Sequence, residues 1–188
     1  MAKGKRGIRV AIFFIILQLT IPALAQQAYL SDVVVTNTRD HLLVYFSVND
    51  CFTVDMNRAI ESGIETTFTF YIRLYKKRDY WWDRKVADRE ISHSIKYDNL
   101  KKIYEVRLSE QNNNVITIKD FDEARRLMAE VIAEKVIALR DLKKSEHYQL
   151  KMMAELNKIR LPLYLHYVFF FLSLWDFETD WYSINFRY

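Results

Sequence analysis

Glycine is almost absent from the chain. Of the three glycines among 188 residues, Gly4 and Gly7 lie in the first 25 residues, so only Gly63 belongs to the body of the protein. Phosphate-binding loops, dinucleotide-binding turns, nucleophile elbows and EF-hands each need glycine at fixed positions. Its scarcity therefore excludes these sites and much of the enzymology that depends on them.

Cysteine is equally scarce. Cys51 is the only one, so no intramolecular disulfide can form and the hydrophobic core alone must stabilise the fold. The 163 residues after residue 25 are enough for this, because a domain of that size buries about 70% of its unfolded surface. The apolar neighbours of Cys51 favour a small buried residue over a reactive thiol.

Acidic residues are missing from the first 25 positions, which hold four basic ones. The rest of the chain has 24 basic and 24 acidic residues, so the net charge of +4 comes entirely from the leader. The basic start, the apolar run Val10–Leu17 and the small residues of Ala23-Leu24-Ala25 predict a signal peptide over residues 1–25, cleaved after Ala25. An uncleaved anchor is disfavoured, because Val10–Ala25 has only 16 residues and a spanning helix needs about 20.

Period-two alternation dominates the body of the chain and predicts antiparallel strands with one apolar face. Two such sheets bury their apolar faces against each other, so we expect a mainly β, immunoglobulin-like antiparallel β-sandwich forming a single domain over residues 26–188. The inward-facing sets are Leu42, Val44, Phe46, Val48; Ile64, Thr66, Phe68, Phe70, Ile72, Leu74; Ile91, His93, Ile95, Tyr97; Tyr104, Val106, Leu108; and Tyr148, Leu150, Met152, Ala154, Leu156.

Two short helices interrupt the predicted strands. Thr53 caps the first, and Gly63 stands where a left-handed C-terminal residue is needed. Asp120 caps the second, with Glu123 three residues on in a capping-box pattern. The second helix ends either at about Ala129, followed by a strand over Val131–Arg140 that forms a hairpin with 147–157, or continues to residue 142; we favour the first.

Turns have to form without glycine. Asn and Asp tolerate left-handed backbone best among the other residues, and they occur at Asn37–Asp40, at Asp98-Asn99 and at Asn112–Asn114. The position of Asp98-Asn99 between Tyr97 and Leu100 predicts a two-residue hairpin turn.

The C-terminal segment is rich in aromatic residues, with 11 among residues 161–188. It completes the core, forms a docking surface for a partner protein, or enters a membrane interface. The acidic residues Asp176, Glu178 and Asp180 disfavour the membrane interface, and whether residues 163–175 are core or exposed surface stays open. Its candidate binding residues are Phe169, Phe170, Trp175 and Trp181.

A second aromatic tract, residues 74–85, interleaves five basic residues with four aromatic ones. Tyr80, Trp81 and Trp82 could stack bases, bind sugars or contact an acidic partner. Export and a net charge of zero argue against a nucleic-acid partner. We favour a hairpin end whose Trp81 and Trp82 pack back on the sheet while the charges are solvated.

No catalytic constellation is visible. The four histidines are scattered, and His93 falls on an apolar face where a hydrogen-bonded core histidine is expected. The Asp176-x-Glu178-x-Asp180 spacing lacks the glycine and the final glutamate of a calcium loop. We therefore expect no metal, no cofactor and no catalytic residues.

The chain contains several short motifs that are informative only when taken together. They are Ala59-x-x-x-Gly63-Ile64, Thr67-Phe68, Tyr97-Asp98-x-Leu100-x-x-x-Tyr104-x-Val106, Phe121-x-Glu123-Ala124, Tyr148-x-Leu150, Leu161-Pro162 and Trp175-x-x-x-Thr179-x-Trp181-Tyr182. This set resembles the bacterial family filed as domain of unknown function 4390. The resemblance implies an exported protein of Gram-negative bacteria without an assigned reaction, often encoded beside membrane sensor kinases.

These observations predict a non-enzymatic periplasmic module that binds a protein of the envelope or inner membrane, such as the external domain of a sensor kinase. The alternative is a small-ligand or glycan-binding module that uses Tyr80, Trp81 and Trp82 as a stacking platform. No transmembrane helix is expected after cleavage, and the oligomeric state stays open.

The export prediction has a direct test. N-terminal sequencing of the protein recovered from the periplasm is expected to begin at Gln26-Gln27, because signal peptidase cleaves after small-x-small sequences. A protein that retains Met1 would contradict the cleavage.

Overall fold

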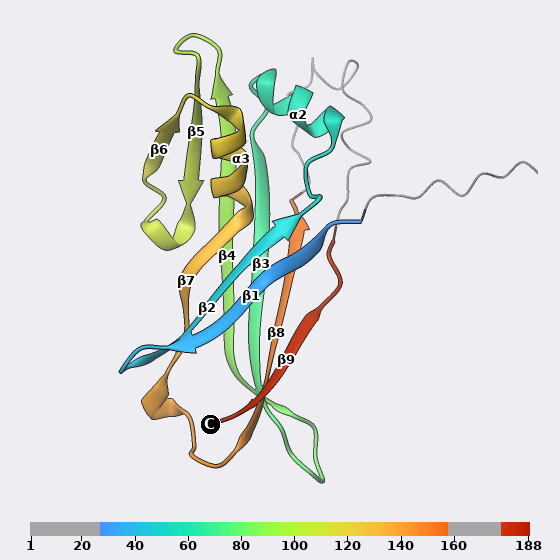
Figure 1. The fold of residues 1–188 in the computed structure, drawn as a ribbon, viewed down its shortest axis with the longest axis vertical. Coiled ribbons are helices and arrows are strands. Elements are labelled where there is room, and N and C mark those ends of the chain that lie inside the picture. The colour runs from blue at the N-terminus through green and yellow to red at the C-terminus, as the bar shows by residue number, and fades with distance from the viewer. Residues whose placement is uncertain (1–26, 158–177) are drawn as a thin grey trace, which may run out of the picture.

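The computed structural model describes residues 27–157 and 178–188, which are mainly strands of two antiparallel sheets. The smaller sheet has the order β1-β2-β7 and the larger one β6-β5-β4-β3-β8-β9 (Figure 1). The predicted mainly β, antiparallel fold is therefore confirmed. The strands are β1 (Tyr29–Asn37), β2 (His41–Asn49), β3 (Thr66–Lys76), β4 (Arg84–Asp98), β5 (Ile103–Leu108), β6 (Val115–Ile118), β7 (Glu130–Ala138), β8 (His147–Leu156) and β9 (Tyr182–Arg187).

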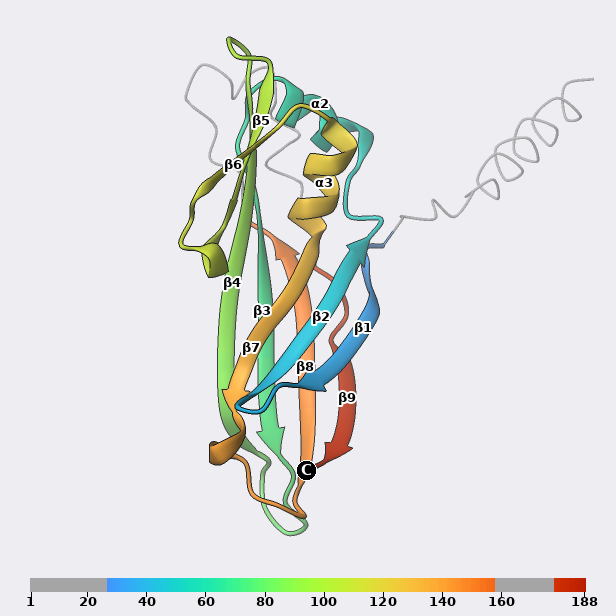
Figure 2. The same cartoon turned by 60° about the vertical axis from the view of Figure 1, so that its left-hand side comes forward.

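The two sheets share one hydrophobic core. Strand β2 buries Val44, Phe46 and Val48, and β3 buries Phe68, Phe70, Ile72 and Leu74, as the alternation predicts. The rings of Phe46 and Phe70 meet edge to face across the sheets, with 5.8 Å between their centroids. The crossing of β1 and β2 over the larger sheet is visible in Figure 2. Cys51 lies in this core, and burial raises the pKa of its thiol to about 12, so it is the expected buried residue.

Both predicted helices form. Helix α2 (Val54–Glu61) begins after Thr53, whose hydroxyl accepts a hydrogen bond from the Met56 amide at 3.2 Å. It ends before Gly63, whose φ is +85°. Helix α3 (Phe121–Ala129) is capped by Asp120, whose carboxylate accepts from the Glu123 amide at 2.8 Å. The caps therefore identified where each helix begins.

The prediction that α3 ends at Ala129 and leads into a strand is also confirmed. The predicted hairpin of that strand with 147–157 is wrong: β7 pairs with β2, whereas β8 pairs with β3 and β9. A short 3₁₀ turn over Leu139–Asp141 and the loop after it carry the chain from one sheet to the other. Period-two alternation shows that each strand has an apolar face, but it does not show which sheet a strand joins, since strands of either sheet turn that face towards the same core.

The predicted two-residue turn at Asp98-Asn99 is wrong as well, because Asp98 pairs with Ile103 and four residues lie between them. The carboxylate of Asp98 accepts from the Leu100 and Lys101 amides, at 2.9 and 3.0 Å. Lys102 then takes a positive φ of 56°. The side-chain bonds of Asp98 stabilise the longer turn, a competition with the backbone typical of this residue.

Several predictions fall outside the described residues. They are the signal peptide over residues 1–25, the placement of residues 163–175 in the core or on the surface, and the candidate residues Phe169, Phe170 and Trp175. Within residues 27–157 and 178–188, no helix is long and apolar enough to cross a membrane.

A stability prediction follows from the loop that joins the sheets. Tyr148 is 1% exposed and its hydroxyl accepts a hydrogen bond from the Lys143 amide at 2.9 Å. Tyr148→Phe leaves that amide without its partner and is expected to lower the free energy of unfolding by about 1–2 kcal/mol in urea denaturation. Tyr29→Phe, on an exposed ring, serves as the control and should change it by less than about 0.5 kcal/mol. Equal effects of the two changes would contradict a role for this bond.

Candidate functional site

Buried polar groups are candidates for catalytic chemistry. Among the described residues, His93 is a histidine that the core buries completely. Its Nδ1 lies 3.0 Å from the Met128 carbonyl oxygen and its Nε2 lies 3.0 Å from Glu110 Oε1. The Phe70 ring packs edge-on against the imidazole at 4.8 Å. With both ring nitrogens engaged, His93 has no nitrogen left to take a proton from a nucleophile. The sequence prediction of a hydrogen-bonded core histidine is confirmed.

The contact with His93 changes the pKa of its partner Glu110. A carbonyl oxygen can only accept, so Nδ1 donates to Met128, and Nε2 is left to face Glu110 Oε1 at hydrogen-bond distance. Burial alone raises the pKa of the Glu110 carboxyl, but the hydrogen bond and charge of His93 outweigh it and the pKa lies below its usual value. This pair stabilises the contact of the β5–β6 connection with the core.

Metal-binding groups do not converge in the described part of the chain, where no three His, Cys, Asp or Glu side chains lie close enough to hold an ion. Asp176 lies outside the described residues, and Asp180 lines a small cavity at the start of β9 instead.

The tip of the β3–β4 hairpin, residues 77–83, carries the most exposed aromatic side chains among the described residues. Tyr80, Trp81 and Trp82 are 93%, 77% and 92% exposed. The prediction that the two tryptophans pack back on the sheet is therefore wrong. The hairpin extends beyond the ends of β1, β2 and β7, so the smaller sheet does not cover its tip (Figures 1 and 2). In both views the tip lies at the lower extremity of the molecule, below the β7–β8 connection (Figures 1 and 2).

Polar contacts hold the base of this tip. Lys77 Nζ lies 2.6 Å from Asp83 Oδ2, and the Arg78 amide donates to Asp83 Oδ1 at 3.3 Å. The hydrogen bond from Lys77 holds the pKa of the Asp83 carboxyl below its usual range. The two ends of the loop are thus tied together while its three rings face solvent.

A polar cavity of about 440 Å³ lies beside the base of the hairpin. None of the three tip rings lines it, so the tip and the cavity are separate features. Its lining residues are Lys77, Asp79, Glu146, His147, Tyr148 and Asn185.

A second surface lies on the outer face of the larger sheet. Tyr71 and Arg73 alternate along β3 with Phe70, Ile72 and Leu74, which are fully buried, so they point away from the core. The guanidinium of Arg73 stacks on two rings, 5.5 Å from the Tyr71 centroid and 4.9 Å from that of Trp181. We call Tyr71, Arg73, Tyr75, Lys151 and Trp181 the outer-face cluster.

Ion pairs and hydrogen bonds hold the cluster in place. Arg73 Nε lies 3.3 Å from Asp88 Oδ1, and Lys151 Nζ lies 5.6 Å from the centroid of Tyr75. Tyr71 donates its hydroxyl proton to Glu155 at 2.8 Å, a bond that raises the pKa of Tyr71 to about 12 and keeps the phenol protonated. The rings and cations therefore present a pre-formed surface.

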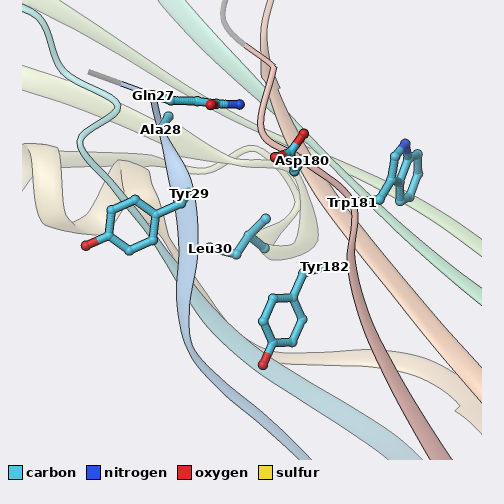
Figure 3. A pocket seen from close by; sticks show the side chains of 7 residues that line it. All are labelled: Gln27, Ala28, Tyr29, Leu30, Asp180, Trp181 and Tyr182. Carbon is cyan, nitrogen blue, oxygen red and sulfur yellow. The ribbon is translucent and has the colours of Figure 1, made fainter. Parts of the chain in front are cut away.

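Trp181 reaches this face because Thr179 anchors the start of the last strand. The Thr179 amide donates to the Ala154 carbonyl at 2.9 Å, and the Thr179 hydroxyl accepts from the Ala154 amide at 3.0 Å. Figure 3 shows Leu30 and Tyr182 turned into the gap between β1 and β9, with Trp181 on the far side of its strand. The cavity there, about 280 Å³, is just below the range of about 300–1,000 Å³ usual for ligand sites.

The structure thus separates the predicted site residues. Tyr80, Trp81 and Trp82 gather at the hairpin tip, whereas Trp181 joins Arg73 and Tyr71, which sequence reasoning had not selected. A signal for them was present, since the outward positions of β3 read Tyr71, Arg73 and Tyr75 where an ordinary solvated face has small polar side chains. Period-two patterns identify the face but not the neighbouring strand that completes a cluster.

Comparison with known proteins agrees with the sequence motifs. The family model described as Domain of unknown function (DUF4390) matches residues 25–185. No curated protein and no solved structure is significantly similar to the chain.

Acid is expected to weaken the contact between His93 and Glu110. Because the Glu110 pKa is lowered on folding, its contribution to stability is present above the ordinary value of 4.5 and is lost as the pH falls through the lower folded value. Glu110→Gln should therefore cost about 1–2 kcal/mol of unfolding free energy at pH 7, and the difference from wild type should shrink towards pH 3. Urea denaturation of wild type and Glu110→Gln at pH values from 7 to 3 measures the cost at pH 7 and its decrease in acid.

The matched control is Glu61→Gln, a change at an exposed carboxylate on α2. A constant difference between wild type and Glu110→Gln from pH 7 to pH 3 would contradict the lowered pKa of Glu110.

Proposed function

We propose that the chain, which belongs to the family described as Domain of unknown function (DUF4390), is a non-enzymatic binding module exported to the periplasm. Its partner is a protein at the inner membrane, and the external domain of a sensor kinase is the first candidate. The contact surface is the outer-face cluster of the larger sheet.

The observation that carries this proposal is the pre-formed stack of Tyr71, Arg73 and Trp181 on a sheet face that no other element within residues 27–157 and 178–188 covers. Trp, Tyr and Arg are the residues enriched at the energetic centre of protein interfaces. Trp181 remains 38% exposed, and the Arg73 side chain 34%, so both have surface left to bury. Because the stack is already ordered, little side-chain freedom is lost on binding.

Two buried groups that could in principle take part in chemistry are held within the described core. His93 is engaged at both nitrogens and Cys51 is buried with a raised pKa. A binding surface needs neither an ionisable pair nor a deep cleft.

The finer fold assignment that we propose is an immunoglobulin-like sandwich. The orders β1-β2-β7 and β9-β8-β3-β4 correspond to strands A-B-E and G-F-C-C′ of that fold. The bond between Tyr148, near the start of β8, and the upstream Lys143 amide corresponds to its tyrosine corner. In this assignment the outer-face cluster lies on the G-F-C-C′ sheet, and β5 and β6 extend that sheet at one edge.

The second candidate is a small-ligand or glycan-binding module. The polar cavity of about 440 Å³ beside the hairpin favours it, since Lys77, Asp79 and Asn185 could bind sugar hydroxyls. Against it, the aromatic rings that would stack on a sugar do not line that cavity.

A photo-crosslinking amino acid in place of Tyr75 tests the contact surface. In cells, it is expected to capture one envelope protein, whereas the same group in place of Ile132, exposed on the smaller sheet, should not. Arg73→Ala together with Trp181→Ala should lower the affinity for the captured protein by about 2 kcal/mol, roughly 30-fold. Thermal unfolding of the double variant checks that the fold is intact.

Capture of the same proteins from positions 75 and 132, or an unchanged affinity of the double variant, would contradict the outer-face cluster as the interface.

A further inference from the structure

We propose that the tip of the β3–β4 hairpin inserts its three aromatic rings into the headgroup region of a bilayer that carries anionic lipid. The protein would then rest on a membrane surface through Tyr80, Trp81 and Trp82. This inference does not depend on the proposed protein partner, because it concerns a different surface.

The exposure of the three aromatic rings favours membrane contact. Three consecutive aromatic side chains, each at least 77% exposed, leave a large amphipathic area in water at a cost that burial would remove. Burial of all three rings at once requires a medium that surrounds the tip, and the bilayer interface is such a medium, in which Trp and Tyr are favoured.

The positive charge around the tip favours a surface that carries anionic lipid. Residues 76–85 hold five basic residues against two acidic ones. Ion pairs join Lys77 to Asp83, Lys76 to Glu146 and Lys85 to Asp88. Among the described residues, the basic side chains of the tip that form no such pair are therefore Arg78 and Arg84. Arg78 and Arg84 are exposed on either side of the rings, where their alkyl stems can lie along the interface and their charges contact lipid phosphates.

The neighbouring loop, residues 139–146, adds three basic residues and two acidic ones to this end of the molecule. Lys76 Nζ lies 2.6 Å from Glu146 Oε1, and the Lys77 amide donates to the His147 carbonyl at 2.9 Å. These contacts hold the β7–β8 connection, with Lys143 and Lys144, beside the hairpin. Because residues 26–188 are neutral overall, the excess of positive charge at this end is matched by negative charge elsewhere, and an anionic surface would orient the molecule tip first.

Trp181 is also partly exposed, but its surroundings suit membrane contact less well than those of the hairpin tip. Trp181 follows Asp180 and Glu178, which anionic lipid would repel, and its ring already contacts Arg73. Aromatic character alone therefore does not select the membrane site; exposure together with basic flanks does.

Vesicle flotation tests the proposal with the purified protein, phosphatidylglycerol–phosphatidylethanolamine vesicles and neutral phosphatidylcholine vesicles. Wild type is expected to float with the anionic vesicles, to do so less at high salt, and to show a blue-shifted tryptophan emission. Trp81→Ala with Trp82→Ala should weaken this binding by about tenfold or more. Arg78→Glu with Arg84→Glu should weaken it on anionic vesicles while the rings remain.

The matched control is Leu100→Ala, which removes an apolar side chain 95% exposed in the turn at the opposite end of β4. All variants share the same N-terminal segment, so any difference among them reports the substituted residues. Equal flotation of wild type and the tryptophan double variant would overturn the proposal, as would equal binding to neutral and anionic vesicles. A tryptophan shift with soluble cell-wall sugars but not with vesicles would overturn it in favour of a glycan site. The vesicles contain no protein, so none of these results depends on the outer-face cluster.

Discussion

The rest of this structure depends on the contact between two sheets that are each apolar on one face only. Each strand of the core has one apolar face, and with a single cysteine no disulfide can staple the sheets together. The faces must therefore exclude water against each other, as the contact of Phe46 with Phe70 illustrates. The buried pair His93–Glu110 is compatible with this core because every nitrogen of the ring has a partner.

Burying one face of the larger sheet turns the side chains of its other face outward. Outward side chains of β3, β8 and β9 become neighbours only because these strands pair, which brings Arg73 next to Trp181 although they are far apart in the sequence. The same sheet also carries the β3–β4 hairpin, which extends beyond the core. Its tip can therefore contact a surface without disturbing the fold. In the functions that we propose, the outer face binds a protein and the tip contacts the membrane, and the two could act at the same time.

Sequence reasoning succeeded where local chemistry decides the structure. The caps at Thr53 and Asp120 and the inward-facing sets were found, since each depends on neighbours within a few residues. It missed β1, where a bulge at Asp32, with φ of 52°, breaks the alternation of Val33, Val34 and Val35. It also missed the first half of β4, because the residues from Arg84 to Glu90 are mostly exposed and show no apolar face. Strand pairing still holds those residues in the sheet.

The sequence by itself determined the class of fold, the two helix caps, the family and the expectation of a core without disulfides, because periodicity, capping and composition are local properties of the chain. Only the tertiary structure decided which sheet receives β7, that Trp81 and Trp82 face solvent, and that Trp181 stacks on Arg73. Those outcomes depend on which surfaces remain uncovered after the sheets have packed. That choice is made by the whole core at once, and no short stretch of residues contains it.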